Sequence, residues 1–178
     1  MKISFLGHAS LQIQIGETYI LVDPFISGNP KASQIDINSL KVDYILITHA
    51  HQDHILDVEA IAKRTGAEVI SNYEIVSYFQ NKGIEGHPMN HGGCWEFEFG
   101  RVKYVNAIHT SSFPDGSYGG QPGGFVIEGE HKNIYIAGDT ALTYDMKLIP
   151  LRTKLDLVIL PIGDNFTMGI EDAIIASD

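Results

Sequence analysis

Three histidines and one aspartate lie within six consecutive residues of this chain, and no other feature constrains the fold as strongly. His49, His51, Asp53 and His54 form the pattern His-x-His-x-Asp-His. Imidazole nitrogens and carboxylate oxygens are ligands that suit zinc, manganese, nickel and iron. No common structural requirement gathers these side chains so closely, and the pattern therefore predicts a metal site.

The residues around this cluster indicate where it lies. Residues 42–47 form a strand-like run before it, and a helical pattern follows it. We therefore expect the cluster in a loop at the carboxyl end of a strand, where α/β folds usually place their sites. His49 and His51 are two residues apart, so in an extended segment they point to the same side and can bind one ion. Asp53 and His54 cannot easily reach that ion, but they can reach a second ion beside it.

The composition excludes several classes of protein. The chain has 178 residues, of which 44% are hydrophobic, and this is typical of one globular domain. A net charge of −10 argues against a nucleic-acid partner, although bound metal ions would still allow a small, anionic substrate. Cys94 is the only cysteine, which fits a cytoplasmic protein. No signal peptide or membrane-spanning stretch is visible, so we expect no membrane partner, and a homo-oligomer stays open.

Taken with four other phrases, the cluster resembles the metallo-β-lactamase superfamily. The phrases are Leu6-Gly7-His8-Ala9-Ser10, Val22-Asp23-Pro24-Phe25, Ala137-Gly138-Asp139-Thr140 and Pro161-Ile162-Gly163-Asp164-Asn165-Phe166-Thr167-Met168-Gly169. The last phrase is similar to the branch of metal-dependent hydrolases related to L-ascorbate-6-phosphate lactonase. The resemblance implies an α/β (α+β) fold, a four-layered αβ/βα sandwich of two similar halves. Periodicity alone predicts only a mixed α/β protein.

The same resemblance completes the metal centre. It implies that His109 joins His49 and His51 on the first ion and that Asp139 bridges the two ions. The superfamily supplies a further histidine to the second ion from a strand after the last helix, whereas the last histidine here, His131, lies in a polar turn. We therefore expect residues 1–178 to form a single domain that is truncated at its C-terminus and lacks its final strand and helix.

Four residues are expected to support this centre. His8 follows a strand and is either a proton donor or substrate contact, or a structural residue, with equal weight. Asp23 is expected to orient the metal loop from behind the ligands, because ligating histidines need their other N–H held. Asp164 and Asn165 are expected at a strand end that faces the same rim.

Periodicity and turn residues predict the remaining elements. The expected strands are 2–6, 11–15, 19–22, 68–70, 94–99, 102–107, 125–128, 133–137 and 156–160, and the expected helices are 55–65, 73–82 and 170–177. Residues 113–124 contain five glycines and two prolines, which predicts a mobile loop. This loop is either a lid over the site or a plain connector or oligomer contact, with equal weight.

These ligands predict metal-assisted hydrolysis. Two divalent ions, zinc in the first place and manganese or nickel as alternatives, would share a hydroxide that attacks a polarised carbonyl or phosphoryl group. Asp53 would hold one ion and orient the hydroxide, and His8 would return a proton to the leaving group. The resemblance favours a lactone or another cyclic ester, and a small phosphodiester is the nearest alternative. A di-iron redox protein and a non-catalytic metal binder are the alternatives of other classes.

Overall fold

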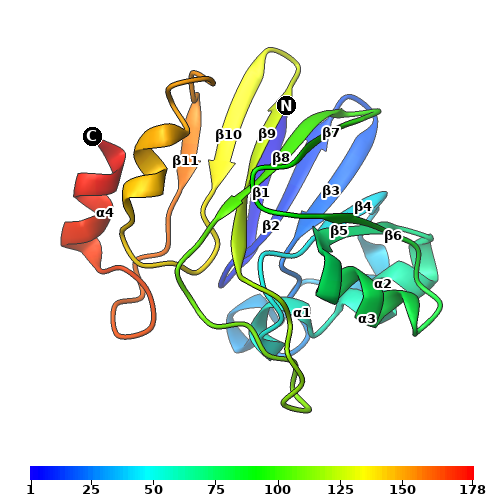
Figure 1. The fold of residues 1–178 in the computed structure, drawn as a ribbon. Coiled ribbons are helices and arrows are strands. Elements are labelled where there is room, and N and C mark those ends of the chain that lie inside the picture. Colours follow the sequence, from blue (N-terminus) through cyan, green and yellow to red (C-terminus); the bar gives the residue numbers. More distant parts are fainter.

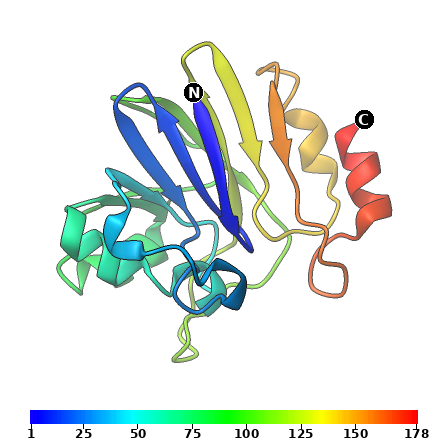
Figure 2. The same cartoon turned by 180° about the vertical axis from the view of Figure 1, so that it is seen from behind.

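The computed structural model describes residues 1–178 as two β-sheets packed face to face (Figures 1 and 2). The first sheet contains, in spatial order, β1 (Lys2–Gly7), β2 (Ser10–Ile15), β3 (Thr18–Val22), β4 (Tyr44–Leu46), β5 (Glu68–Asn72) and β6 (Gly86–Met89). Its first three strands are antiparallel, and β3 to β6 are parallel.

The second sheet contains, in spatial order, β11 (Leu157–Ile159), β10 (Lys132–Ile136), β9 (Gly123–Gly129), β8 (Gly100–Asn106) and β7 (Cys94–Phe97). All of its pairs are antiparallel except β10 and β11. The helices are α1 (Gln52–Ile55), α2 (Val58–Thr65), α3 (Tyr73–Gln80) and α4 (Ile170–Ser177), with 3-10 turns at Pro30–Ala32 (η1), Ile37–Ser39 (η2) and Tyr144–Leu148 (η3). None of the helices is long and apolar enough to cross a membrane.

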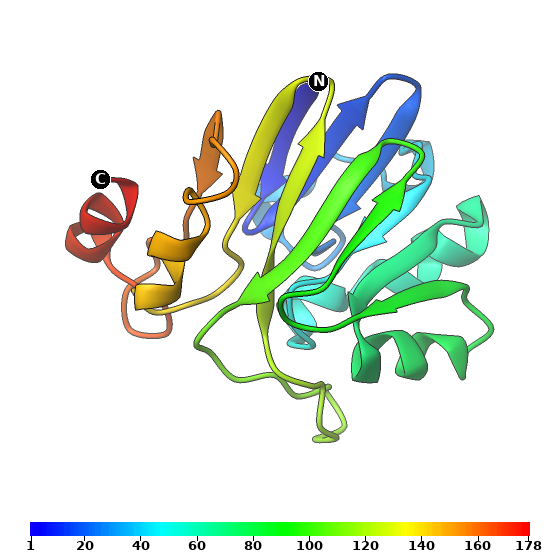
Figure 3. The same ribbon diagram turned by 45° about the horizontal axis from the view of Figure 1, so that its top comes forward.

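Three apolar clusters hold the layers together. Ile13 and Ile20 of the first sheet pack against Phe125 and Ile134 of the second, and this cluster is the core between the sheets. A second cluster joins α2 and α3 to the outer face of the first sheet, and a third joins η3 and α4 to the outer face of the second (Figure 3). The helix–sheet–sheet–helix order confirms the predicted four-layered sandwich.

Two elements differ from the sequence-based expectation. The predicted helix 55–65 begins later, as α2 at Val58, and the short helix α1 precedes it. Between the two, the Asp57 carboxylate accepts hydrogen bonds from the backbone N–H groups of Ile26 (2.6 Å) and Ser27 (2.9 Å). The strand β6 is absent from the prediction because it contains Pro88, which is tolerated there only since β6 is an edge strand.

The glycine-rich segment 113–124 is anchored at both ends. Phe113 is buried in the core, and the Asn72 side chain donates to the Gly119 carbonyl over 2.9 Å. A Cβ at Gly119 or Gly123 would lie 2.3 Å from Ala50 or Tyr104, so these glycines permit close packing rather than motion. Within the segment, the tip at residues 114–118 and Gln121 are exposed, and the tip is the longest run that could move as a lid.

Candidate metal centre

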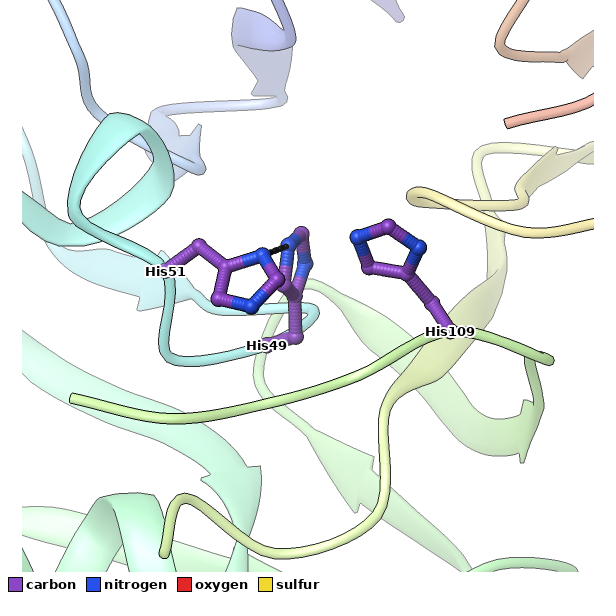
Figure 4. Close-up of side chains that lie close together, drawn as sticks. All are labelled: His49, His51 and His109. Atoms are coloured by element: carbon purple, nitrogen blue, oxygen red, sulfur yellow. Dashed lines mark hydrogen bonds between the residues drawn. The ribbon is translucent and has the colours of Figure 1, made fainter. Parts of the chain in front are cut away.

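The three predicted histidine ligands of the first ion face one another (Figure 4). His49 and His51 lie on the segment after β4, and His109 follows β8. Nε2 of His49 is 3.0 Å from Nδ1 of His51, and the His109 ring centroid lies 5.0 and 5.1 Å from those of His49 and His51. One nitrogen of each ring lies within 4.8 Å of the others, which is close enough for one ion to bind all three.

A second group of donors lies beside the first. His8, Asp53 and His54 offer ligand atoms within 4.8 Å of one another, and Nε2 of His8 is 2.9 Å from Oδ2 of Asp53. Asp139 Oδ2 lies 3.6 Å from Nε2 of His54 and 3.9 Å from Nε2 of His109. Asp139 therefore lies near one histidine of each group, and the bridging role that the family resemblance implies for it stays a prediction.

Strands of both sheets end at this centre. His8 follows β1, Asp23 follows β3, His49 follows β4, His109 follows β8 and Asp139 follows β10. His8 and Asp23 have positive φ angles of 54° and 43°, which are uncommon for residues other than glycine. Such backbone strain concentrates at functional sites, where the surrounding structure holds it in place.

Asp23 is buried and orients two side chains of the metal loop. Its Oδ1 accepts a hydrogen bond from the Thr48 backbone N–H (2.8 Å), and its Oδ2 accepts one from the Thr48 hydroxyl (2.6 Å). Oδ2 also lies 2.9 Å from Nδ1 of His54. The carboxylate thus holds His54 by Nδ1 and leaves Nε2 directed towards Asp53 and Asp139.

Thr48 extends this support to His49, and the sequence-based prediction did not include it. Its hydroxyl proton is donated to Asp23, so the hydroxyl oxygen accepts from Nδ1 of His49 at 3.0 Å. This assigns the proton of His49 to Nδ1 and leaves Nε2 free as a ligand atom. On the far side, the Thr110 hydroxyl lies 3.3 Å from Nε2 of His51. Hydroxyl residues next to the histidines were the only sequence signal for these contacts.

The electrostatics of the centre favour cation binding. Burial, together with the neighbouring histidines, lowers the pKa of His49 well below its usual value, so this ring is a neutral ligand. The hydrogen bond from His8 lowers the pKa of Asp53 to about 2. Burial opposes ionisation of Asp139, but His54 and His109 outweigh it and lower the pKa of Asp139. Both carboxylates are therefore charged at neutral pH.

His54 gives the most direct test of whether the donors fit a metal. Its Nε2 is buried and has no hydrogen-bond partner, and the nearest carboxylate oxygens, from Asp139 and Asp53, lie at 3.6 and 3.9 Å. Burial lowers the pKa of His54, yet Asp23 and Asp139 raise it to about 10 overall. A positive charge at Nε2 of His54 is therefore favourable, and a divalent cation bound to neutral His54 would supply it.

Three other polar residues lie outside the centre. Asp164 and Asn165 are exposed in a turn after β11, and their hydrogen bonds stay within that turn or involve Met168. The structure thus does not join them to the metal ligands, and their role at the rim stays a prediction. His131 is exposed in the β9–β10 turn, as expected.

A cavity of about 410 Å³ opens beside the centre. His8, Asp23 and Asp139 line it together with apolar residues of β1 and β11, among them Phe5 and Ile159. No lysine or arginine lines it. The cavity therefore has no positively charged side chain that could bind a phosphate group.

Comparisons with known proteins agree with this geometry. A family model described as a Beta-lactamase superfamily domain matches residues 18–178. A UPF0173 metal-dependent hydrolase of Flavobacterium johnsoniae is 76% identical over 100% of this chain and 79% of its own length. One from Thermus thermophilus is 49% identical over 98% of this chain and 76% of its own length. The structure of Igni18, a metallo hydrolase from Ignicoccus hospitalis, is 33% identical over 98% of this chain and 76% of its own, with a TM-score of 0.88.

Proposed function

The chain belongs to the metallo-β-lactamase superfamily and, within it, to the UPF0173 metal-dependent hydrolases, and from this premise we propose that its substrate is a small ester, in the first place a lactone or another cyclic ester. The observation that carries the proposal is the pairing of two donor groups. His49, His51 and His109 form one group, and His54 and Asp53 belong to the other. The cavity beside these two groups could hold a small substrate next to the ions that they would bind.

The residues present suit two divalent ions, and zinc is our first choice because histidine nitrogens dominate the donor set. Manganese and nickel accept the same ligands. When bound, such ions supply an activated water at neutral pH and polarise the ester oxygen. His49, His51 and His109 would hold one ion, Asp53 and His54 the other, and Asp139 both.

The protein's own side chains would orient the ligating rings and donate a proton. Asp23 and Thr48 fix the rings of His54 and His49, so little reorganisation is needed when substrate binds. His8 is held by its contact with Asp53, and its side chain is 41% exposed, so it can transfer a proton to a leaving oxygen in the cavity. We assign this proton donation to His8.

The lining of the cavity supports an uncharged ester. The branch of the family related to L-ascorbate-6-phosphate lactonase would act on a phosphorylated sugar, but no lysine or arginine faces the cavity. A lactone without a phosphate group requires no lysine or arginine in the cavity. The acidic surface and single cysteine likewise support a cytoplasmic enzyme that acts on small molecules.

Metal content and turnover test the proposal together. We expect zinc-loaded protein to open an aliphatic γ-lactone and Asp53→Ala to lose metal and about 100-fold or more of kcat/KM. Asp172→Asn, in the exposed first turn of α4, is the matched control and should behave like the wild type. Turnover of bis-p-nitrophenyl phosphate but of no lactone would replace the ester by a phosphodiester. Full activity of Asp53→Ala would overturn the mechanism.

A further inference from the structure

We propose that a second cavity, on the outer face of the second sheet, binds a small organic anion with an apolar body and a carboxylate or phosphate group. The cavity lies between β8, β9 and η3 and has a volume of about 320 Å³. Sites for small molecules begin at about 300 Å³. It shares no lining residue with the cavity beside the metal centre, so the proposal does not depend on which bond the enzyme cleaves.

Four apolar side chains line this cavity. Val105 of β8 and Val126 of β9 are buried and belong to the apolar cluster on the outer face of the sheet. Leu148 and Ile149 line it from the end of η3 and the residue that follows. An apolar lining of this kind can bury the body of a small molecule, while a few polar groups fix its orientation.

Two cationic side chains line the same cavity. Lys103 lies on β8, two residues before Val105, and Arg152 lies in the loop before β11. Four other basic residues pair with carboxylates, namely Lys63, Lys82, Arg101 and Lys132. Lys103 and Arg152 form no ion pair, although the chain has 22 acidic residues. A guanidinium can bind both oxygens of a carboxylate or phosphate, and an ammonium adds a further charged donor.

The only carboxylate that lines the cavity is already hydrogen-bonded. Oδ2 of Asp145 accepts from the side-chain amide of Asn106 over 2.6 Å, and Asp145 forms no ion pair with Lys103 or Arg152. Nε2 of His91 lies 2.9 Å from the Pro122 carbonyl oxygen, to which it donates. Counting His91 as neutral, two cations and one carboxylate leave one excess positive charge, which a bound anion would balance.

Three probes that share a phenyl ring test the charge that the cavity prefers. Benzoate, phenylphosphonate and benzylamine are titrated separately into the zinc-loaded chain. The backbone amide shifts of Val126 and Leu148 report binding in this cavity, even where an anion also binds the metal ions. We expect at least one anion to bind about tenfold or more tightly than benzylamine. Tighter binding of benzoate would identify a carboxylate as the ligand group, and tighter binding of phenylphosphonate a phosphate.

Variants show whether the two cations make the contact. Arg152→Gln and Lys103→Gln should each weaken binding of the preferred anion by about tenfold or more, because each removes a charged donor. Arg152 is exposed and unpaired, so its replacement should leave the melting temperature unchanged. Lys154→Gln is the matched control. It removes the same charge two residues away, but Lys154 does not line the cavity, so the affinity should stay unchanged.

Three results would overturn the proposal. Benzylamine binding as tightly as the anions, or more tightly, would assign the cavity to cations through Asp145. Unchanged affinity in both Arg152→Gln and Lys103→Gln, or an equal loss in Lys154→Gln, would mean that the lining cations do not hold the anion. Unchanged amide shifts of Val126 and Leu148 with every probe at millimolar concentration would mean that the cavity binds no such molecule. None of these results would alter the lactone assay, which tests the metal centre separately.

Discussion

At the residue scale, the Thr48 hydroxyl is the contact that joins the two donor groups. It donates to Asp23, which also holds His54, and it accepts from Nδ1 of His49. Thr48→Val keeps the shape of the side chain but removes this hydroxyl. We expect zinc affinity to fall about 10- to 100-fold, as is usual when a partner of a ligating histidine is lost.

Competition titration with a zinc chelator measures this affinity, and circular dichroism checks the fold. Thr65→Val is the matched control, because the Thr65 hydroxyl bonds only within and just beyond α2. Both variants should show native spectra, with weakened zinc binding in Thr48→Val alone. Equal zinc affinity in the two variants would mean that Thr48 does not support the ligands.

The clustering of the donor side chains could be predicted from the sequence, whereas the support from Thr48 could not. His49, His51, Asp53 and His54 are adjacent in the chain, and their spacing alone indicates a metal. The Thr48 contact depends on Asp23, which is 25 residues away, and on a rotamer that only the packed structure fixes. Asp23 itself was predicted from the family resemblance.

At the scale of elements, Glu59 ties α2 to the end of α3. Its carboxylate accepts from Lys63 (2.8 Å) in the same helix and from Lys82 (2.7 Å) just after α3. These contacts lower the pKa of Glu59 from 4.5 to about 2. Since the pKa is lower in the folded state, the stabilisation is complete above about pH 4.5 and is lost as the pH falls towards 2.

We expect Glu59→Gln to reduce stability by about 0.5 kcal/mol at pH 7, a modest effect because the side chain is 39% exposed and screened by solvent. Urea unfolding at pH 7 and at pH 2.5 measures the change, which should nearly vanish at the lower pH. Glu17→Gln, in the β2–β3 turn, is the control, because Glu17 makes no ion pair. A pH-independent difference would show that the carboxylate charge is not the cause.

Alternating or continuous apolar runs predicted most strands close to their observed bounds. The short helix α1 and the later start of α2 were not predicted, because Asp57 between them bonds to Ile26 and Ser27, far away in the chain. The glycines of residues 113–124 were interpreted as flexible, whereas Gly119 and Gly123 pack against neighbouring side chains. Local composition does not reveal which of these two uses a glycine serves.

At the scale of the whole molecule, the metal centre joins the two sheets. His49, His51, Asp53 and His54 follow β4 of the first sheet, whereas His109 and Asp139 follow β8 and β10 of the second. Periodicity alone could not predict this arrangement, because it requires knowing which strands share a sheet. The family resemblance provided the four layers and the pairing of the two halves.

This arrangement predicts that metal ions stabilise the whole fold. Ions bind the folded centre and not the separated sheets, so zinc at about 100 times its Kd should add about 2.7 kcal/mol. For a chain of this size, we expect the melting temperature to fall by about 5–11 °C on chelation. Scanning calorimetry with zinc and with EDTA measures the difference. His109→Ala, which removes the proposed ligand from the second sheet, should lose most of this response, whereas His131→Ala in the exposed β9–β10 turn should keep it. An equal response in both variants would mean that zinc stabilises the protein somewhere other than between the sheets.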